Sequence, residues 1–417
     1  MIGPRVTATQ TDPPARWGQL AVLAGGMLLA FAPWFSASAV APSLAAEWGT
    51  SGLDLPLLTV AVQLGFAAAA LLMAASGATD VVSGRVLFLV GTVVAGVANL
   101  GFAVVPSDAG AALPFRALTG AAFALVYPVG MRMIAGWFQG GRGLAIGVLI
   151  GALTVGSALP HLLRSVGVAA GAEWRPVVVA SSVVAVAGGL LVVVFARKGP
   201  FETDAPRFSL ATAAAAFRDP AVRLANLGYL GHMWELYAMW TWIPLFIAAS
   251  FAAAGSVDPA VAALAAFAVV AVGGAGCVVA GSLADRLGRT TLTMAAMAIS
   301  GSSAVAIGFL FGAPPIVVLA LALVWGVTVV ADSAQFSTAV SELSPPGTAG
   351  SALQLQVAAG FVLTGFTIVG VGLLDPLDGS GWRLAFASLA VGPAVGIVAM
   401  WRLRRRPESV RMAGGRR

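Results

Sequence analysis

The fold of this chain is decided by the sequence GSLADRLGR at residues 281–289 and by a related sequence, SGATDVVSGR, at residues 76–85. Each is a short polar stretch between two long apolar runs, and Asp285 follows Asp80 by about half of the 417 residues. An internal repeat of this length indicates two related halves. The sequence therefore predicts one helical architecture that occurs twice.

The composition excludes an ordinary soluble protein. Hydrophobic residues make up 59% of the chain and charged residues 10%, with a mean hydropathy of +0.94, whereas a soluble domain is roughly 25% charged. The single cysteine, Cys277, lies in an apolar run, so neither an intramolecular disulfide nor a cysteine-based metal site can form. We expect a polytopic membrane protein without a metal or a cofactor.

Apolar runs of about 20 residues have the length at which a helix crosses a 30 Å hydrocarbon layer. The sequence predicts twelve membrane helices and no strand, an all-α membrane protein. The expected spans are residues 17–43, 55–78, 86–106, 111–135, 143–164, 175–196, 223–250, 258–283, 291–312, 315–340, 349–373 and 383–401.

The distribution of basic residues predicts the orientation. Most of the 23 Lys and Arg residues fall on one side if both termini are cytoplasmic, as the positive-inside rule requires. A polar, proline-containing link separates the halves, and the scarcity of lysine against many Ala, Val and Gly indicates a bacterial inner-membrane protein. The expected organisation is a cytoplasmic N-terminal segment (1–16), a six-helix bundle (17–197), a cytoplasmic linker (198–222), a second six-helix bundle (223–401) and a basic cytoplasmic tail (402–417).

Two ionisable residues, His232 and Glu235, interrupt the apolar stretch from Leu224 to Phe251. A charge at the centre of a membrane helix costs about 2.5–3.5 kcal/mol, so such residues indicate function. Glu235 is predicted to load and release a proton, assisted by His232 one turn away and by Asp332, the other intramembrane acid. The alternative is a fixed His232–Glu235 hydrogen bond that only stiffens the helix.

The repeated loops, twelve spans, orientation and central link resemble the major facilitator superfamily, whose loop pattern GxLaDrxGRr is matched by residues 281–289. The first copy departs from this pattern, with Ser76 in place of the first glycine and one extra residue before Gly84. The RxxxG pattern from Arg116 to Gly120 is a further likeness. The resemblance implies that the loop charges hold one conformation of a gate, which assigns this role to Asp80, Arg85, Asp285, Arg286 and Arg289.

The same resemblance implies that spans one, four, seven and ten line a central cavity near the midplane. Polar and aromatic residues concentrate in these spans, and the predicted substrate-binding residues are Trp34, Arg116, Tyr127, Arg132, Tyr229, Trp234, Tyr237 and Gln335. Packing is the alternative for the aromatic residues, and snorkelling or pairing with an acid is the alternative for the two arginines. Gly147 and Gly151 in span five are expected to allow close helix packing.

These features favour a secondary transporter that moves a small solute by alternating access. The two intramembrane arginines favour proton-coupled uptake of a small organic anion; proton-driven efflux of a hydrophobic compound is the alternative. No phosphate-binding loop for ATP occurs. The two scattered histidines argue against a membrane enzyme, and the short tail argues against a sensor. The expected partners are the solute, protons and the lipid bilayer, with no nucleic acid and a monomeric state.

Overall fold

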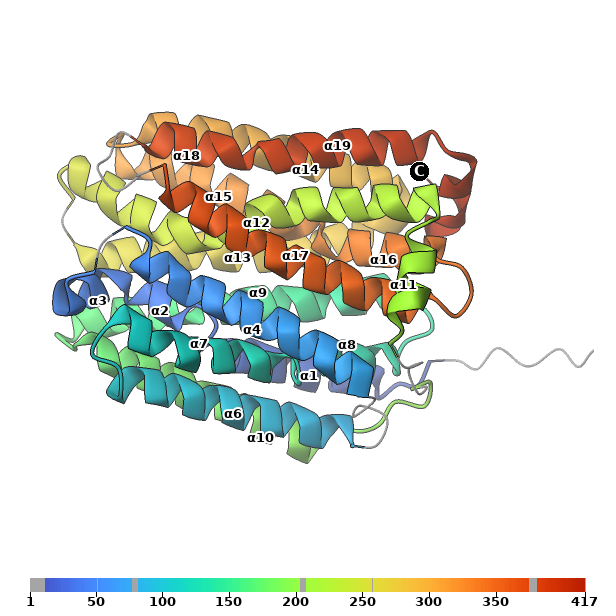
Figure 1. Cartoon of the computed structure of the whole chain (residues 1–417), viewed down its shortest axis with the longest axis horizontal. Coiled ribbons are helices and arrows are strands. Elements are labelled where there is room, and N and C mark those ends of the chain that lie inside the picture. The colour runs from blue at the N-terminus through green and yellow to red at the C-terminus, as the bar shows by residue number, and fades with distance from the viewer. Residues whose placement is uncertain are drawn as a thin grey trace, which may run out of the picture.

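The computed structural model describes residues 12–50, 52–76, 82–202, 208–256, 258–374 and 381–416, and every regular element in these ranges is helical (Figure 1). Within these ranges, eleven helical stretches are long and apolar enough to cross a membrane. They cover the predicted spans two to twelve. The all-α class is therefore confirmed.

Most of these stretches are single helices, whose intrahelical hydrogen bonds satisfy backbone groups as the membrane interior demands. Pro160 and Pro244 each lie inside one of them without ending it. Aspartate caps begin two of them: Asp219 Oδ1 accepts a hydrogen bond from Ala221 N at 2.7 Å, and Asp258 Oδ1 accepts one from Ala260 N at 2.8 Å. The uninterrupted helices are α4 (Asp54–Ser76), α6 (Gly84–Val104), α9 (Arg142–Ala169), α10 (Trp174–Phe195), α12 (Pro220–Ala253), α13 (Pro259–Leu287), α14 (Arg289–Ile307) and α17 (Ala349–Gly372).

Four predicted spans are interrupted, so that each consists of two or three helical pieces. Pro33 and Pro128 lie at two of the interruptions, because proline cannot donate the backbone hydrogen bond that a helix interior needs. The pieces are α1 (Arg16–Ala30), α2 (Ser36–Ala39) and α3 (Ala41–Trp48); α7 (Ala109–Phe123) and α8 (Tyr127–Ala135); α15 (Pro315–Ala331) and α16 (Ser333–Leu343); and α18 (Trp382–Leu389) and α19 (Val391–Arg404).

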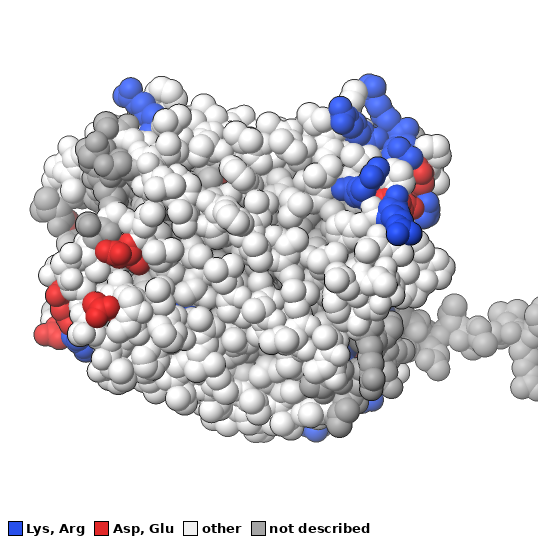
Figure 2. Space-filling view, viewed as in Figure 1, with Lys and Arg blue, Asp and Glu red and all other residues white. Residues whose placement is uncertain are grey.

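The helices run nearly parallel to one another, those of residues 16–195 in the lower part of Figure 1 and those of residues 220–404 in the upper part. Within the first group α4 packs on α7 and α6 on α10; within the second, α12 packs on α17 and α19. The two groups meet where α9 packs against α13 and α4 against α17. Figure 2 shows the charged side chains at the two ends of the molecule with an uncharged band between them, as a membrane-spanning protein requires.

Small residues bring α9 and α13 together. A Cβ atom at Gly147 would lie 2.8 Å from the backbone oxygen of Cys277, and one at Gly151 would lie 2.7 Å from that of Gly274. A Cβ atom at Gly274 would likewise lie 2.9 Å from the backbone oxygen of Gly151. Only glycine allows backbones to approach so far. The expected close packing of span five is confirmed, and its partner is the second half of the chain; we call this contact the α9–α13 seam.

Candidate functional site

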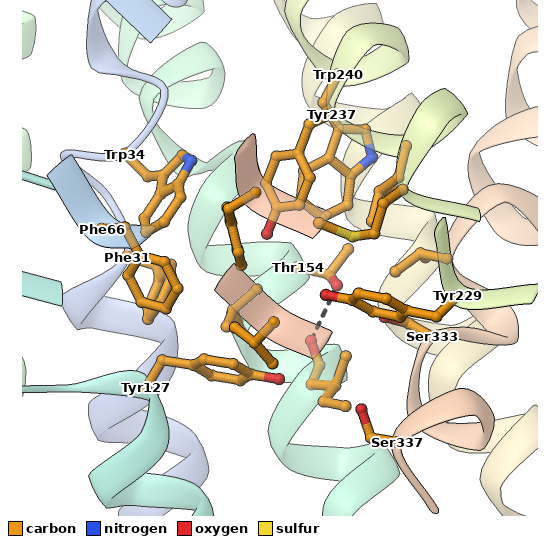
Figure 3. A pocket seen from close by; sticks show the side chains of 17 residues that line it. Phe31, Trp34, Phe66, Tyr127, Thr154, Tyr229, Tyr237, Trp240, Ser333 and Ser337 are labelled. Atoms are coloured by element: carbon orange, nitrogen blue, oxygen red, sulfur yellow. Dashed lines mark hydrogen bonds between the residues drawn. The ribbon is translucent and has the colours of Figure 1, made fainter. Parts of the chain in front are cut away.

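A cavity lies at the centre of the molecule, between the two groups of helices. The space within it that protein atoms do not fill, part of which is open to solvent, is about 600 Å³, and Figure 3 shows its side chains converging from both groups. No Asp, Glu, His, Lys or Arg among the described residues lines it. The lining residues are Phe31, Trp34, Phe66, Tyr127, Ile150, Leu153, Thr154, Tyr229, Met233, Leu236, Tyr237, Trp240, Val330, Ser333, Ser337, Val357 and Phe361.

Three of the interrupted spans bring residues to this cavity at their breaks. Trp34 lies in the turn between α1 and α2, Tyr127 begins α8, and Ser333 begins α16. A broken helix turns side chains and backbone groups toward a cavity that a continuous helix would leave covered. The predicted location of the site at spans one, four, seven and ten therefore agrees with the position of the cavity.

Aromatic rings from both halves form the wall. The ring of Phe66 lies 4.4 Å from that of Phe361, and the ring of Trp34 lies 6.1 Å from that of Tyr237. These centroid distances are those of favourable aromatic pairs. Because each pair joins a residue of the first half to one of the second, the rings close the cavity by contact between the halves.

The polar groups on the wall are hydroxyls and the indole N–H groups of Trp34 and Trp240. All three tyrosines of the chain, Tyr127, Tyr229 and Tyr237, line the cavity, and none of their hydroxyls has a hydrogen-bond partner among the described residues. A buried phenol usually finds a partner. Their hydroxyls are therefore available to a bound solute, as donors or as acceptors.

Glu235 lies outside the cavity, on the side of α12 that faces α14 and α15. Its Oε1 accepts a hydrogen bond from Trp325 Nε1 at 2.6 Å, and its Oε2 accepts one from Ser300 Oγ at 2.8 Å. Glu235 is only 2% exposed. The two donors offset part of the free energy that burial costs the carboxylate. The His232–Glu235 hydrogen bond considered as an alternative does not form.

His232 instead approaches Asp332, at the junction of α15 and α16. The two residues are 2% and 1% exposed, and Nδ1 of His232 lies 2.9 Å from Oδ1 of Asp332. The angles at this contact do not meet hydrogen-bond geometry, and His232 Nε2 and both carboxylate oxygens lack such a bond. An isolated buried carboxylate is costly. His232 is thus the ionisable neighbour that the structure places against this buried carboxylate.

Arg116 is completely buried and holds the break in the first span. Its Nη1 donates to Pro33 O at 3.1 Å, to Ser36 Oγ at 3.2 Å and to Asn99 Oδ1 at 2.9 Å, and its Nη2 donates to Trp34 O at 2.7 Å. These contacts occupy both terminal nitrogens. Arg116 neither snorkels to the surface nor lines the cavity. Its donors instead bind the backbone that carries Trp34 and hold it in place.

The other predicted substrate-binding residues that do not line the cavity have different partners. Arg132 Nε lies 3.7 Å from Glu202 Oε1. This contact agrees with the alternative that Arg132 pairs with an acid. Trp234 Nε1 donates to Ser388 O at 3.1 Å. Gln335 Oε1 accepts from Arg289 Nη1 at 2.7 Å. Of the eight predicted residues, the cavity is lined by Trp34, Tyr127, Tyr229 and Tyr237.

Two of the predicted gate residues of the second repeat, Asp285 and Arg289, form a cluster with Glu342 at one end of α13. Arg289 donates to Glu342 from Nε at 2.8 Å and from Nη2 at 2.7 Å, and its Nη2 lies 3.4 Å from Asp285 Oδ1. Arg286 is exposed. In the first repeat Arg85 Nη1 donates to Ala196 O at 3.2 Å, while Asp80 lies outside the described residues. The corresponding contact of the first loop therefore stays a prediction.

Several cavity residues were missed by the sequence analysis. Phe66 and Phe361 belong to α4 and α17, spans that the resemblance did not assign to the cavity, and in an apolar span phenylalanine has no signal that separates lining from packing. Ser333 and Ser337 had a usable signal. Together with Asp332 and Gln335 they make a polar cluster of helical spacing in a span whose other residues are mostly apolar.

The comparisons with known proteins agree with this arrangement. Residues 23–369 match the sequence model that describes the Major Facilitator Superfamily. The chain belongs to this superfamily. It is therefore a multi-pass membrane protein and a transporter rather than an enzyme. No curated protein matches the sequence significantly.

Among solved structures, the superfamily member is similar to a D-xylose-proton symporter, with 16% identity, a TM-score of 0.72 and coverage of 94% of this chain and 98% of the other. It is also similar to a bacterial homologue of the human lysosomal transporter Spinster in an inward-facing, unoccupied conformation, with 15% identity, a TM-score of 0.71 and coverage of 94% and 98%. At such identities the likeness concerns the fold alone.

Proposed function

We propose that this transporter carries a small, uncharged, largely apolar solute with polar groups near its centre, coupled to protons. The observation that carries the proposal is the cavity wall, which presents aromatic rings and three unpartnered tyrosine hydroxyls without a charged side chain. Aromatic faces bind apolar surface, and a few placed hydroxyls orient it. The anion expected from Arg116 and Arg132 has no cationic partner in this cavity, so hydrophobic-compound transport is the better supported of the two alternatives.

Coupling is proposed to run through α12. Leu236 and Tyr237 face the cavity, whereas the adjacent Glu235 contacts Ser300 of α14 and Trp325 of α15. A solute that displaces α12 therefore changes the distance from Glu235 to its two donors. Protonation of Glu235 removes its charge, which lowers the cost of leaving these donors. The His232–Asp332 pair is the second group proposed to exchange a proton.

Alternating access is proposed to occur between the six-helix bundles 17–197 and 223–401. In this proposal α1, α2 and α3 together form the first span, which brings the number of spans to twelve. Both termini and the linker 198–222 are proposed to face the cytoplasm of a bacterial cell, and the protein to act as a monomer. The positive charge of one end of the sequence supports this orientation.

The solute class is tested with purified protein in lipid vesicles. Binding is followed by tryptophan fluorescence over a panel that pairs uncharged aromatic compounds with carboxylates of equal size, and flux is then measured in both directions for each compound that binds. We expect uncharged compounds to bind, and Trp34→Ala to weaken binding by about 1–3 kcal/mol through lost aromatic contact. Binding of carboxylates alone would refute the proposed solute class.

The coupling role is tested with Glu235→Gln, which keeps the side-chain size and removes the exchangeable proton. We expect an imposed pH gradient to drive accumulation in the unmodified protein but not in the variant, while solute exchange without a gradient continues. Glu173→Gln, at an exposed site, is the matched control. Gradient-driven accumulation by Glu235→Gln at the unmodified level would show that Glu235 does not couple transport to protons.

A further inference from the structure

A basic groove lies far from the central cavity, between the start of α12 and the end of α19. The space within it that protein atoms do not fill, part of which is open to solvent, is about 1340 Å³, and four arginines line it: Arg223, Arg402, Arg405 and Arg406. Figure 2 shows Lys and Arg side chains gathered at this end, where α19 leads into the C-terminal tail. The positive-inside rule explains basic residues at this end of the helices, but it does not require them to surround a groove.

The charge of this groove is not neutralised by nearby acids. Arg406 donates to both oxygens of Glu408 at 3.2 Å, and Arg411 lies 3.9 Å from Asp219. Both neighbouring carboxylates are thereby occupied. Arg223, Arg402 and Arg405 are exposed and have no acidic partner among the residues that the structure describes. The groove therefore carries three positive charges without an acidic partner among the described residues, and one of them, on Arg405, lies 3.6 Å from the centroid of the Trp401 ring.

Beyond its basic end the groove has an apolar wall. Leu224, Leu227 and Leu230 line it at a spacing of three residues, which places them on one side of α12. Leu227 is 44% exposed, and Trp401 on α19 is 43% exposed. Large apolar side chains exposed on a membrane protein face the hydrocarbon layer. The groove is thus basic at the membrane surface and apolar toward the membrane interior.

A buried acceptor without a partner lies in the same groove. Asn226 is 3% exposed and lines the groove. Its Nδ2 donates to Val222 O at 2.8 Å, but its Oδ1 has no hydrogen-bond partner. A buried carbonyl oxygen without a donor costs free energy. A ligand that supplies a hydroxyl donor beside the three arginines would satisfy it.

We propose that this groove binds one anionic phospholipid of the inner leaflet, with a hydroxyl-bearing headgroup such as that of phosphatidylglycerol. The phosphate contacts Arg223, Arg402 and Arg405, a headgroup hydroxyl donates to Asn226 Oδ1, and an acyl chain lies along the leucines. Basic pockets at the cytoplasmic ends of membrane helices bind anionic headgroups in this way. The lipid would join α12, which carries Glu235, to α19 and the tail.

The test counts phospholipids bound to the purified protein by native mass spectrometry, with phosphatidylglycerol and phosphatidylcholine supplied in equal amounts. We expect one phosphatidylglycerol to be retained preferentially. Replacing Arg223, Arg402 and Arg405 together by glutamine should weaken its binding about fivefold for each arginine removed. The triple variant Arg197→Gln, Lys198→Gln and Arg218→Gln removes the same charge from exposed positions outside the groove and should retain the lipid.

Three results would overturn the proposal. They are equal retention of both lipids by the unmodified protein, retention of phosphatidylglycerol by the groove variant, and equal loss in the control variant. Glycerol 1-phosphate without acyl chains should not compete for the groove; if it displaces the lipid at micromolar concentration, the site is one for soluble phosphate. Asn226→Leu should weaken phosphatidylglycerol binding more than phosphatidic acid binding, because the second headgroup has no hydroxyl group outside its phosphate.

Discussion

At the scale of single residues, the polar side chains of the membrane interior divide into two kinds. Arg116 holds the backbone of Pro33 and Trp34 in place and does not reach the cavity. Glu235 and the His232–Asp332 pair join helices of the second half and are the groups proposed to exchange protons. A charge buried in a membrane span therefore need not contact the transported solute, and its hydrogen-bond partners decide which role it has.

Arg116→Lys tests the first kind of role. Lysine keeps the charge but cannot reproduce the forked donors that contact Pro33 O, Trp34 O and Asn99 together. Hydrogen bonds of charged groups contribute about 1.5–3 kcal/mol each, so we expect the stability of the first half to fall by about 2 kcal/mol or more and solute affinity to fall with the displaced Trp34. Thermal unfolding in detergent and the fluorescence titration measure these changes.

Arg175→Lys is the control for that substitution, because Arg175 pairs with Glu47 at the surface, with Nη2 and Oε1 2.6 Å apart. Exposed ion pairs contribute about 1 kcal/mol or less. If Arg116→Lys unfolds at the same temperature as the unmodified protein, the buried guanidinium does not stabilise the break between α1 and α2.

Residue patterns could predict part of the site. The cost of a charge in hydrocarbon pointed to Glu235 and Asp332, and the concentration of polar and aromatic residues in spans one, four and seven pointed to four cavity residues. The hydrogen-bond partners of Glu235 could not be predicted from such patterns. Trp325 and Ser300 are far from Glu235 in the sequence, and only the packing of α14 and α15 on α12 brings them together.

At the scale of elements, the α9–α13 seam determines how closely the halves approach. Hydropathy predicted the lengths of the uninterrupted helices well, because the thickness of the bilayer sets them. It could not predict the break at Asp332, where no proline occurs. Hydropathy also could not show that the glycines of α9 face α13, because nothing in the sequence around a glycine indicates which helix packs against it.

Gly151→Ala tests the seam. The added Cβ would lie 2.7 Å from Gly274 O, and the contact is with backbone, which cannot turn aside as a side chain can. Overpacking of this kind costs about 1–3 kcal/mol. We expect the variant to populate conformations in which α9 and α13 are separated, and distances between spin labels on the two helices should increase.

Gly370→Ala in α17 is the matched control, because a Cβ there meets nothing within 4 Å. It should leave the label distances unchanged. Unchanged distances in Gly151→Ala as well would mean that the seam does not hold the halves together.

At the scale of the whole molecule, the C-terminal tail is part of the folded structure. The tail was expected to mark the cytoplasmic side, and its elements η3 (Pro407–Arg411) and η4 (Ala413–Gly415) fold back against the second half. Ala413 N donates to Glu342 Oε2 at 3.2 Å, and Met412 is fully buried. Glu342, which accepts hydrogen bonds from Arg289, therefore also accepts one from the tail.

Met412→Ala should destabilise the second half. Truncation of a buried methionine costs about 2–5 kcal/mol, and the loss should also free Glu342 from the tail. We expect a lower unfolding temperature and faster proteolysis after Arg404. Val410→Ala, at a residue that is 50% exposed, should change neither quantity; an effect as large as that of Met412→Ala would show that the tail is not docked through Met412.

The position of Cys277 makes the unmodified protein its own conformational reporter. Its thiol is 2% exposed and donates to Val330 O at 3.5 Å, and its backbone oxygen faces Gly147 across the seam. Because no other thiol exists in the chain, a maleimide dye can modify only this position, without a cysteine-free background. We expect modification to be slow while the halves are in contact, faster in Gly151→Ala, and slower again when a solute closes the cavity. The rate of dye attachment to Cys277 would thus measure how often the α9–α13 seam opens.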